Sequence, residues 1–187
     1  MTLDIKQAVD VLRQGGVILY PTDTIWGIGC DATCETAVKR VFNIKQRIDS
    51  KALLVLVDSV AKLQGYVDEL PDVAWDLIEL SEKPLTIIYS GAKNLAKNMV
   101  ASDGTVGIRI TNEPFSKRLC ETFRKPIVST SANVSGSESP SCFQEISEEI
   151  LSAVDYVVTY RQDDRSKAVP SSIIKLGLTG EIKIIRE

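Results

Sequence analysis

Two basic side chains stand close together where they could bind an anion. Lys45 and Arg47 follow a segment with helical spacing. Ser50 and Lys51 come after them, just before a buried apolar run. An arginine can place two N–H groups on phosphate or carboxylate oxygens, and a lysine acts as a point charge. The pair could hold a polyphosphate, but cations at the end of a helix also complement its dipole and are common on solvated surfaces.

Arg109 lies within the apolar segment Val106–Ile110, which has the pattern of a buried strand. A guanidinium in such a segment costs several kcal/mol if it stays unpaired. We therefore expect it to meet an Asp or Glu of the protein, a ligand carboxylate, or water at the end of the strand. This arginine is the strongest single-residue indication of an anionic substrate.

A hydroxyl and an amide follow another predicted strand. Ser131 and Asn133 come directly after the strand at 126–130 and are two residues apart, so they point to one side wherever the extended conformation persists. Such groups can donate and accept hydrogen bonds to a ribose or a phosphate. The alternative is an ordinary serine-rich turn.

The segment from Tyr20 to Ala32 reads as a loop with two threonines, Thr22 and Thr24, around one acid, followed by Gly27 and Gly29. Glycines let the backbone approach a ligand closely. The glycines also match the dinucleotide fingerprint GxGxxA. We reject that match, because the first glycine does not end the strand and basic residues stand where the ribose-binding acid would be expected.

The composition excludes several kinds of chemistry. The chain has 187 residues and no histidine, so imidazole bases and histidine metal ligands are absent. Its 22 basic and 25 acidic residues argue weakly against non-specific nucleic-acid binding. The longest apolar run has six residues and no signal sequence is evident, so we expect a cytoplasmic protein without a membrane span. No CxxC pair occurs, so reduced thiols are expected at Cys30, Cys34, Cys120 and Cys142.

Helical and strand patterns alternate along the chain, which predicts one α/β domain over residues 1–187 with a mixed sheet covered by helices. Helices are expected at 5–12, at 35–45 with Thr33 as cap, at 60–67, 73–78 and 113–122, and at 141–153 with a capping box that starts at Ser141; a short helical turn is expected at 95–99. Strands are expected at 17–20, 53–57, 85–89, 106–110, 126–130, 156–158, 172–175 and 182–185. Ligands in such sheets gather where strands end.

Taken together, these motifs resemble the YrdC-like family of threonylcarbamoyl-AMP synthases in its short bacterial form. The matching segments, in the order of the family, are YPTDTIWGIGCDA at 20–32, Lys45 with Arg47, KPLT at 83–86, VGIR at 106–109, SAN at 131–133 with SG at 135–136, and Ser171–Ser172. Each is weak by itself. Six in this order, spanning nearly the whole chain, make the resemblance specific.

The resemblance implies a twisted YrdC/RibB-like sheet with a central basic cavity, and an enzyme that converts ATP, L-threonine and bicarbonate into threonylcarbamoyl-AMP and pyrophosphate. It assigns ATP binding to Lys45, Arg47, Ser131, Asn133 and Arg186, with Lys45 and Arg47 also catalytic. Threonine binding falls to Thr22 or Thr24, to Arg109 and to Ser171. Mg²⁺ would accompany ATP without a metal site built by the protein. The product would serve a tRNA threonylcarbamoyl transferase complex, with possible contact to tRNA or double-stranded RNA.

The sequence departs from the family pattern at Ile48, Lys83 and Thr130, which concern loop rigidity, and at Leu56, where longer members often have histidine. Two other functions stay open at this stage. One is an RNA-binding module that assists tRNA or ribosome maturation without catalysis. The other is an enzyme that adenylates carbamate itself.

Overall fold

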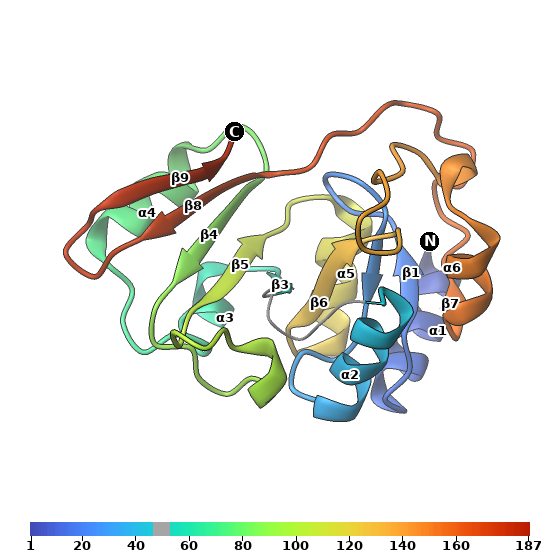
Figure 1. Cartoon of the computed structure of the whole chain (residues 1–187), viewed down its shortest axis with the longest axis horizontal. Helices are drawn as coiled ribbons and strands as arrows, with labels where there is room; N and C mark the ends of the chain where they lie inside the picture. The colour runs from blue at the N-terminus through green and yellow to red at the C-terminus, as the bar shows by residue number, and fades with distance from the viewer. Residues whose placement is uncertain (47–52) are drawn as a thin grey trace.

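The computed structural model describes residues 1–46 and 53–187 (Figure 1). The helices are α1 (Thr2–Arg13), α2 (Glu35–Ile44), α3 (Val60–Leu63), α4 (Asp72–Leu80), α5 (Pro114–Phe123) and α6 (Glu148–Ala153), with short 3₁₀ helices η1 (Lys97–Met99) and η2 (Phe143–Glu145). The strands are β1 (Ile18–Tyr20), β2 (Gly27–Gly29), β3 (Leu54–Val57), β4 (Leu85–Tyr89), β5 (Val106–Ile110), β6 (Ile127–Ser131), β7 (Tyr156–Val157), β8 (Ser172–Leu176) and β9 (Ile182–Arg186).

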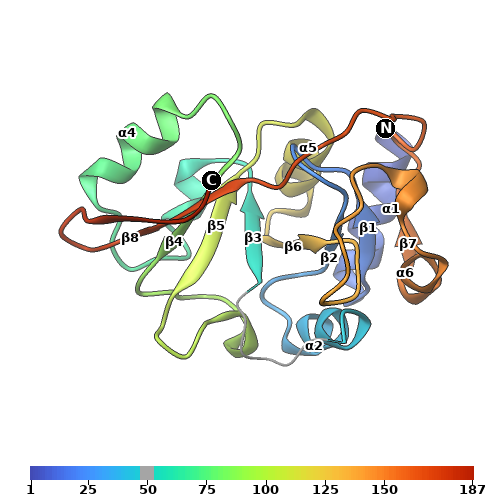
Figure 2. The same ribbon diagram turned by 45° about the horizontal axis from the view of Figure 1, so that its top comes forward.

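The strands of the described residues form one open sheet in the order β7-β1-β2-β6-β3-β5-β4-β8-β9. Strands β1 and β7, β3 and β5, and β4 and β8 pair in parallel, and the other neighbours are antiparallel. The predicted α/β fold with a mixed sheet is confirmed. Figure 2 shows β7 and α6 near one end of the sheet and the β8–β9 hairpin at the other, with α4 beside the hairpin.

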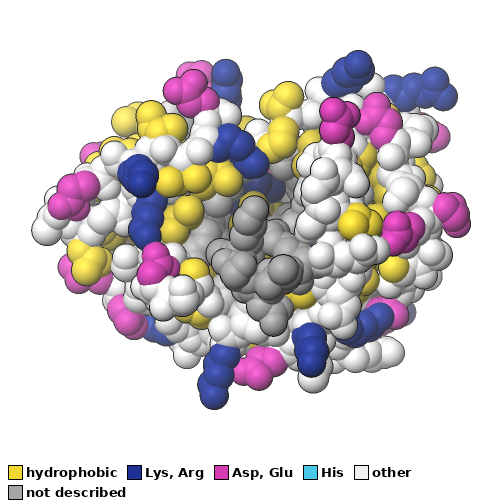
Figure 3. Space-filling view, in the orientation of Figure 1, with side chains coloured by type: hydrophobic (Ala, Val, Ile, Leu, Met, Phe, Trp, Pro, Cys, Tyr) yellow, Lys and Arg dark blue, Asp and Glu magenta, His cyan; other side chains and the backbone are white. Residues whose placement is uncertain are grey.

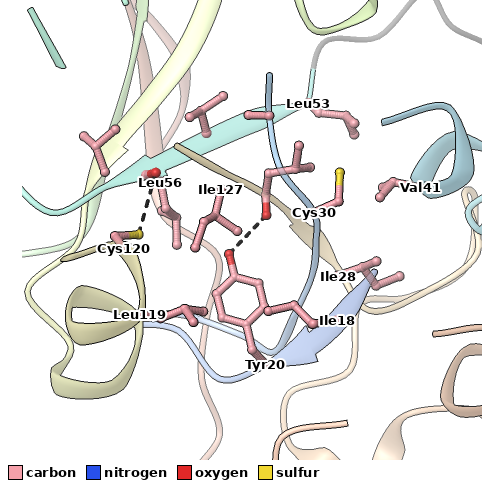
Figure 4. Close-up of a cluster of buried hydrophobic side chains, with 14 of the residues drawn as sticks. Ile18, Tyr20, Ile28, Cys30, Val41, Leu53, Leu56, Leu119, Cys120 and Ile127 are labelled. Carbon is pink, nitrogen blue, oxygen red and sulfur yellow. Dashed lines mark hydrogen bonds between the residues drawn. The ribbon is translucent and has the colours of Figure 1, made fainter. Parts of the chain in front are cut away.

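One part of the core lies where β1, β2, β3 and β6 meet α5 (Figure 4). The Tyr20 ring is fully buried there, and its hydroxyl donates a hydrogen bond to the Val128 carbonyl at 3.1 Å. Gly29 makes room for this ring, because a Cβ built at residue 29 would lie 2.6 Å from Tyr20 Cε1 and 2.6 Å from the Val128 oxygen. The need for glycine at residue 29 therefore comes from core packing.

This finding corrects the prediction that residues 20–32 form a continuous loop. The segment Gly27–Gly29 is strand β2, which pairs antiparallel with β1 on one side and with β6 on the other. Two of the three residues of this strand are glycines, which are depleted in strands, so the residue pattern did not indicate a strand. The strand conformation is stabilised instead by hydrogen bonds to neighbours on both edges.

Two predicted helix starts were also wrong. Thr33 does not cap α2; its N–H and hydroxyl both donate to Asp31, and the cap position is Cys34. The helix expected over 141–153 is divided, because Ile146 adopts an extended conformation and buries its side chain between η2 and α6. The N–H and the hydroxyl of Ser141 both donate to a carboxylate oxygen of Glu145.

We predict that Gly29→Ala destabilises the fold, because the new methyl group overlaps the Tyr20 ring and a strand carbonyl. The free energy of unfolding should fall by about 1–3 kcal/mol, the usual cost of overpacking a core. Urea denaturation measures it. Gly107→Ala is the matched control, since its Cβ would meet no atom closer than 3.4 Å; equal losses in the two variants would contradict the packing argument.

Candidate active site

A cleft of about 280 Å³ opens near the middle of the sheet, and Figure 3 shows the surface hollowed there. Its polar lining includes side chains on or beside β5, β6, β8 and β9, and Gly27 of β2 also borders it: the polar residues include Arg109, Ser129, Ser131, Ser171 and Arg186. Trp26, Leu54 and Ile88 are among its apolar walls. Arg109 and Arg186 are the charged residues among the described residues that line it. The cleft is therefore a positively charged, partly apolar cavity, as the fold prediction expected.

Arg109 is buried at the floor of this cleft with only 2% of its surface exposed. Its Nη2 lies 2.9 Å from Asp23 Oδ1 and donates a hydrogen bond to Thr24 Oγ1 at 3.2 Å. Its Nε is buried without a hydrogen-bond partner among the described residues. Burial raises the pKa of the Asp23 carboxyl, and the positive charge of Arg109 opposes that shift. The sequence left three kinds of partner open for Arg109. The structure shows that one of its partners is a carboxylate of the protein, that of Asp23.

The two threonines of the first loop have different places. Thr22 closes the turn: its hydroxyl donates to the Ile25 carbonyl at 2.8 Å and accepts from the Thr24 N–H at 3.1 Å. The two hydroxyls lie 3.0 Å apart. Because Thr24 Oγ1 alone also contacts Arg109, it is the threonine nearer the cleft. Both side chains lie behind Arg109 and are absent from the cleft lining.

Ser171 and Arg186 meet on the opposite wall. Arg186 donates from Nε and Nη2 to the Ser171 carbonyl at 2.9 and 2.7 Å. The Ser171 hydroxyl lies 2.8 Å from Thr86 Oγ1, and both side chains are buried. Burial and the nearby positive charge of Arg109 both lower the pKa of Arg186. The two arginines thus act on one small volume, where an anion would be stabilised.

The structure brings together Lys45, Ser131 and Asn133, three of the residues that the family resemblance assigned to ATP. The buried Lys45 Nζ donates to the carbonyls of Ser131 and Asn133 at 2.6 and 2.7 Å, and lies 3.4 Å from Ser131 Oγ and Asn133 Oδ1. Strand β6 ends at Ser131, so Asn133 reaches the ammonium from the turn beyond the strand. The Ser135 N–H donates to the Lys45 carbonyl at 2.9 Å and closes this turn against the end of α2.

Some of the residues singled out in the sequence lie elsewhere. Arg47 and Ile48 are outside the described residues. Leu56 is fully buried in the core, whereas Thr130 lines the cleft. Lys83 borders a second cavity of about 250 Å³.

Sequence reasoning missed two residues of the site. Asp23 was noted only as the acid between two threonines, although the cost of an unpaired buried Arg109 required a partner. Thr86 was noted only as part of the KPLT motif, and its contact with Ser171 joins parallel strands 85 residues apart in the chain. For Asp23, the need of a buried Arg109 for a partner was a signal in the sequence. The contact of Thr86 with Ser171 depends on which strands pair, so the sequence carries no signal for it.

Other described features bear on the class of protein. The four cysteines are free thiols, with Cys30 and Cys120 buried. The described ranges bring together no three Cys, Asp or Glu side chains that could hold a metal ion, and contain no helix long and apolar enough to cross a membrane. An open mixed sheet with an arginine-lined cleft defines an α/β protein whose cleft has the charge and shape suited to a small anionic ligand.

Comparison with known proteins specifies the family. The model of the Sua5/YciO/YrdC family, described as "Telomere recombination", matches residues 10–187. A curated threonylcarbamoyl-AMP synthase of Pseudoalteromonas translucida is 38% identical over 157 residues, which are 82% of this chain and 84% of the relative. The chain belongs to the Sua5/YciO/YrdC family.

Two solved structures resemble the fold over nearly the whole chain. E. coli YciO has a TM-score of 0.84 at 28% identity, covering 98% of this chain and 88% of that one. P. abyssi Sua5 complexed with L-threonine has a TM-score of 0.82 at 26% identity, covering 92% of this chain. The match spans half of that Sua5 chain.

We predict that Lys45→Met lowers the free energy of unfolding by about 1–3 kcal/mol, because two carbonyls at the turn after β6 lose a buried donor. Hydrogen exchange at the Ser135 amide should accelerate in the same variant, which NMR can follow. Lys39→Met, on the exposed face of α2, is the control. A Lys45→Met protein with unchanged stability and exchange would show that the ammonium does not hold the turn.

Proposed function

We propose that this protein is a threonylcarbamoyl-AMP synthase that joins L-threonine, bicarbonate and ATP. Family membership and the relatives that carry this name support the proposal. The observation that carries it in the structure is a single cleft with a buried arginine at its floor and a lysine-bound Ser-x-Asn turn at its edge. One end suits an amino-acid carboxylate, and the other suits a nucleotide.

In the proposed reaction, the deprotonated amine of threonine attacks CO₂ derived from bicarbonate and forms a carbamate. A carbamate oxygen then attacks the α-phosphorus of ATP, and pyrophosphate leaves. Arg109 would bind the threonine carboxylate, Ser171 would help to fix its orientation, and Thr24 would act through its hydrogen bond with Arg109. Positioning and charge neutralisation contribute most of the rate in such a transfer, so no covalent nucleophile is required.

We assign the nucleotide to Ser131 and Arg186, which line the cleft from its two sides, with Asn133 and Lys45 in the turn beside Ser131. Arg47 is assigned to ATP by the family resemblance alone. Mg²⁺ would accompany ATP and be held mainly by phosphate oxygens and water, the ligands it prefers. When bound, it would neutralise charge on the leaving pyrophosphate.

The product would pass to a tRNA threonylcarbamoyl transferase complex, and we place the activity in the cytoplasm. A mixed anhydride of a carbamate and AMP is reactive toward water, so prompt transfer to an acceptor is chemically favoured. The complex and any direct contact with tRNA are proposals from the family resemblance.

Pyrophosphate release tests the proposed function. We expect release only when ATP, L-threonine and bicarbonate are all present, and threonylcarbamoyl-AMP should be detected by mass spectrometry. Turnover with carbamoyl phosphate and indifference to threonine would favour adenylation of carbamate itself. No turnover, with RNA binding that weakens steeply as salt rises, would favour an RNA-binding module.

We predict that Arg109→Ala raises the KM for threonine by at least about 30-fold, because loss of one partner of a buried charge pair costs roughly 2–5 kcal/mol. The KM for ATP should change much less than the KM for threonine, since the residues assigned to the nucleotide are retained. Steady-state pyrophosphate release measures both constants. Unchanged threonine dependence would show that Arg109 does not bind the carboxylate.

A further inference from the structure

The guanidinium that is assigned to the substrate carboxylate already has a carboxylate beside it. Arg109 Nη2 lies 2.9 Å from Asp23 Oδ1 and 3.2 Å from Thr24 Oγ1. A guanidinium grips a carboxylate with two parallel N–H groups, either Nε with Nη2 or Nη1 with Nη2. Both arrangements use Nη2. A substrate carboxylate that binds Arg109 bidentately therefore shares Nη2, the atom beside Asp23 Oδ1, and brings a second anion close to Asp23.

We propose that Asp23 neutralises Arg109 in the ligand-free protein, and that Asp23 binds a proton when the threonine carboxylate binds Arg109 from the cleft. This inference rests on the proposed function. Asp23 is accordingly a positioning residue that acts through Arg109. It keeps the buried cation neutralised and oriented until the substrate arrives, and it sets the pH dependence of substrate binding.

The charges around Asp23 support proton uptake. Arg109 faces it from β5 and is the cation paired with it, while Glu113 at the start of α5 adds a negative charge. The neutral side chains of Tyr20 on β1 and Cys120 on α5 also lie within its electrostatic reach, and Glu82 and Lys83 share a cavity with it. A threonine carboxylate would place a second anion on the same arginine. Like charges at one site raise a carboxyl pKa, and the pKa of Asp23 is already raised by burial.

The proton has a route that does not pass through the substrate. Asp23 borders the second cavity, and its side chain is 13% exposed. That cavity contains Ile87 of β4 and Ile108 of β5, whereas the cleft contains Ile88 and Gly107 of the same strands. Neighbours along a strand point to opposite faces, so the two cavities lie on opposite faces of the sheet. Asp23 can exchange a proton with water on one face while Arg109 binds threonine on the other.

Isothermal titration calorimetry of L-threonine into the full-length protein tests the proposal. Titrations at about pH 6 in buffers of different ionisation enthalpy give the number of protons bound, and we expect net uptake. Because binding then consumes a proton, the Kd for threonine should fall as the pH falls from about 8 to about 6. L-Threoninamide, which has no carboxylate, should bind more weakly and without uptake at Asp23.

Asp23→Asn imitates the protonated carboxyl. We expect it to bind threonine about tenfold more tightly than wild type at about pH 8, with loss of the proton uptake. Without threonine, Asp23→Asn should melt at a lower temperature than wild type. Adding threonine should raise its melting temperature by more than it raises that of wild type. Asp31→Asn is the matched control, because Asp31 is a buried carboxylate paired with Lys125 at 2.7 Å, away from Arg109. Its threonine affinity and proton uptake should equal those of wild type.

The outcomes separate this inference from the proposed function. Threonine binding without proton uptake, or uptake that Asp23→Asn retains, overturns the role of Asp23 and leaves the synthase function intact. A higher Kd for threonine in Asp23→Asn than in wild type also overturns the role of Asp23. No threonine binding in wild type overturns both. If the Asn variant does not fold, the comparison of threonine with threoninamide on wild type still decides the question.

Discussion

The burial of one positive charge in an apolar sheet constrains much of this structure. Arg109 lies on β5 between isoleucines, where an unpaired guanidinium would cost several kcal/mol. The pairing with Asp23 meets that cost, and it requires the loop after β1 to reach across the sheet to β5. Thr22 and Thr24 fix the shape of this loop through hydrogen bonds within it. The position of the loop and the floor of the cleft both depend on this one ion pair.

The cleft also depends on strands whose order in space differs from their order in the chain. Strand β6 lies between β2 and β3, and β4 lies between β5 and β8. This order brings the turn after β6 to one side of the cleft and Ser171, before β8, to the other. Lys45 extends the arrangement from α2, because its ammonium is bound by the carbonyls of that turn. Side chains from distant segments therefore meet over a small volume, as ligand sites in open α/β sheets usually do.

Burial has different consequences for the two arginines of the cleft. The environment of Arg109 contains a carboxylate that balances its charge, whereas Arg186 is bound to a backbone carbonyl and has its pKa lowered by burial and by Arg109. Two cations close together favour ligands with more than one negative charge. This asymmetry agrees with a site that binds a singly charged carboxylate beside a polyphosphate.

Local patterns in the sequence determined most of the elements. Alternating helical and strand periodicity predicted the α/β class, and strands β4, β5, β8 and β9 lie within one residue of their predicted bounds. The exceptions are places where tertiary contacts override local preference. In strand β2 the Tyr20 ring leaves no room for a side chain at Gly29, and the helix predicted at 141–153 is broken because Ile146 turns into the core.

The candidate site divides in the same way. The sequence by itself identified Arg109, Lys45, Ser131 and Asn133, because charge in an apolar strand and polar groups at a strand end are visible without a fold. Only the tertiary structure decided that Asp23 is the partner of Arg109 and that Thr86 supports Ser171, since both contacts span about 85 residues and depend on which strands pair. Residue type determines which interactions a side chain needs, whereas strand order determines which residue can supply them.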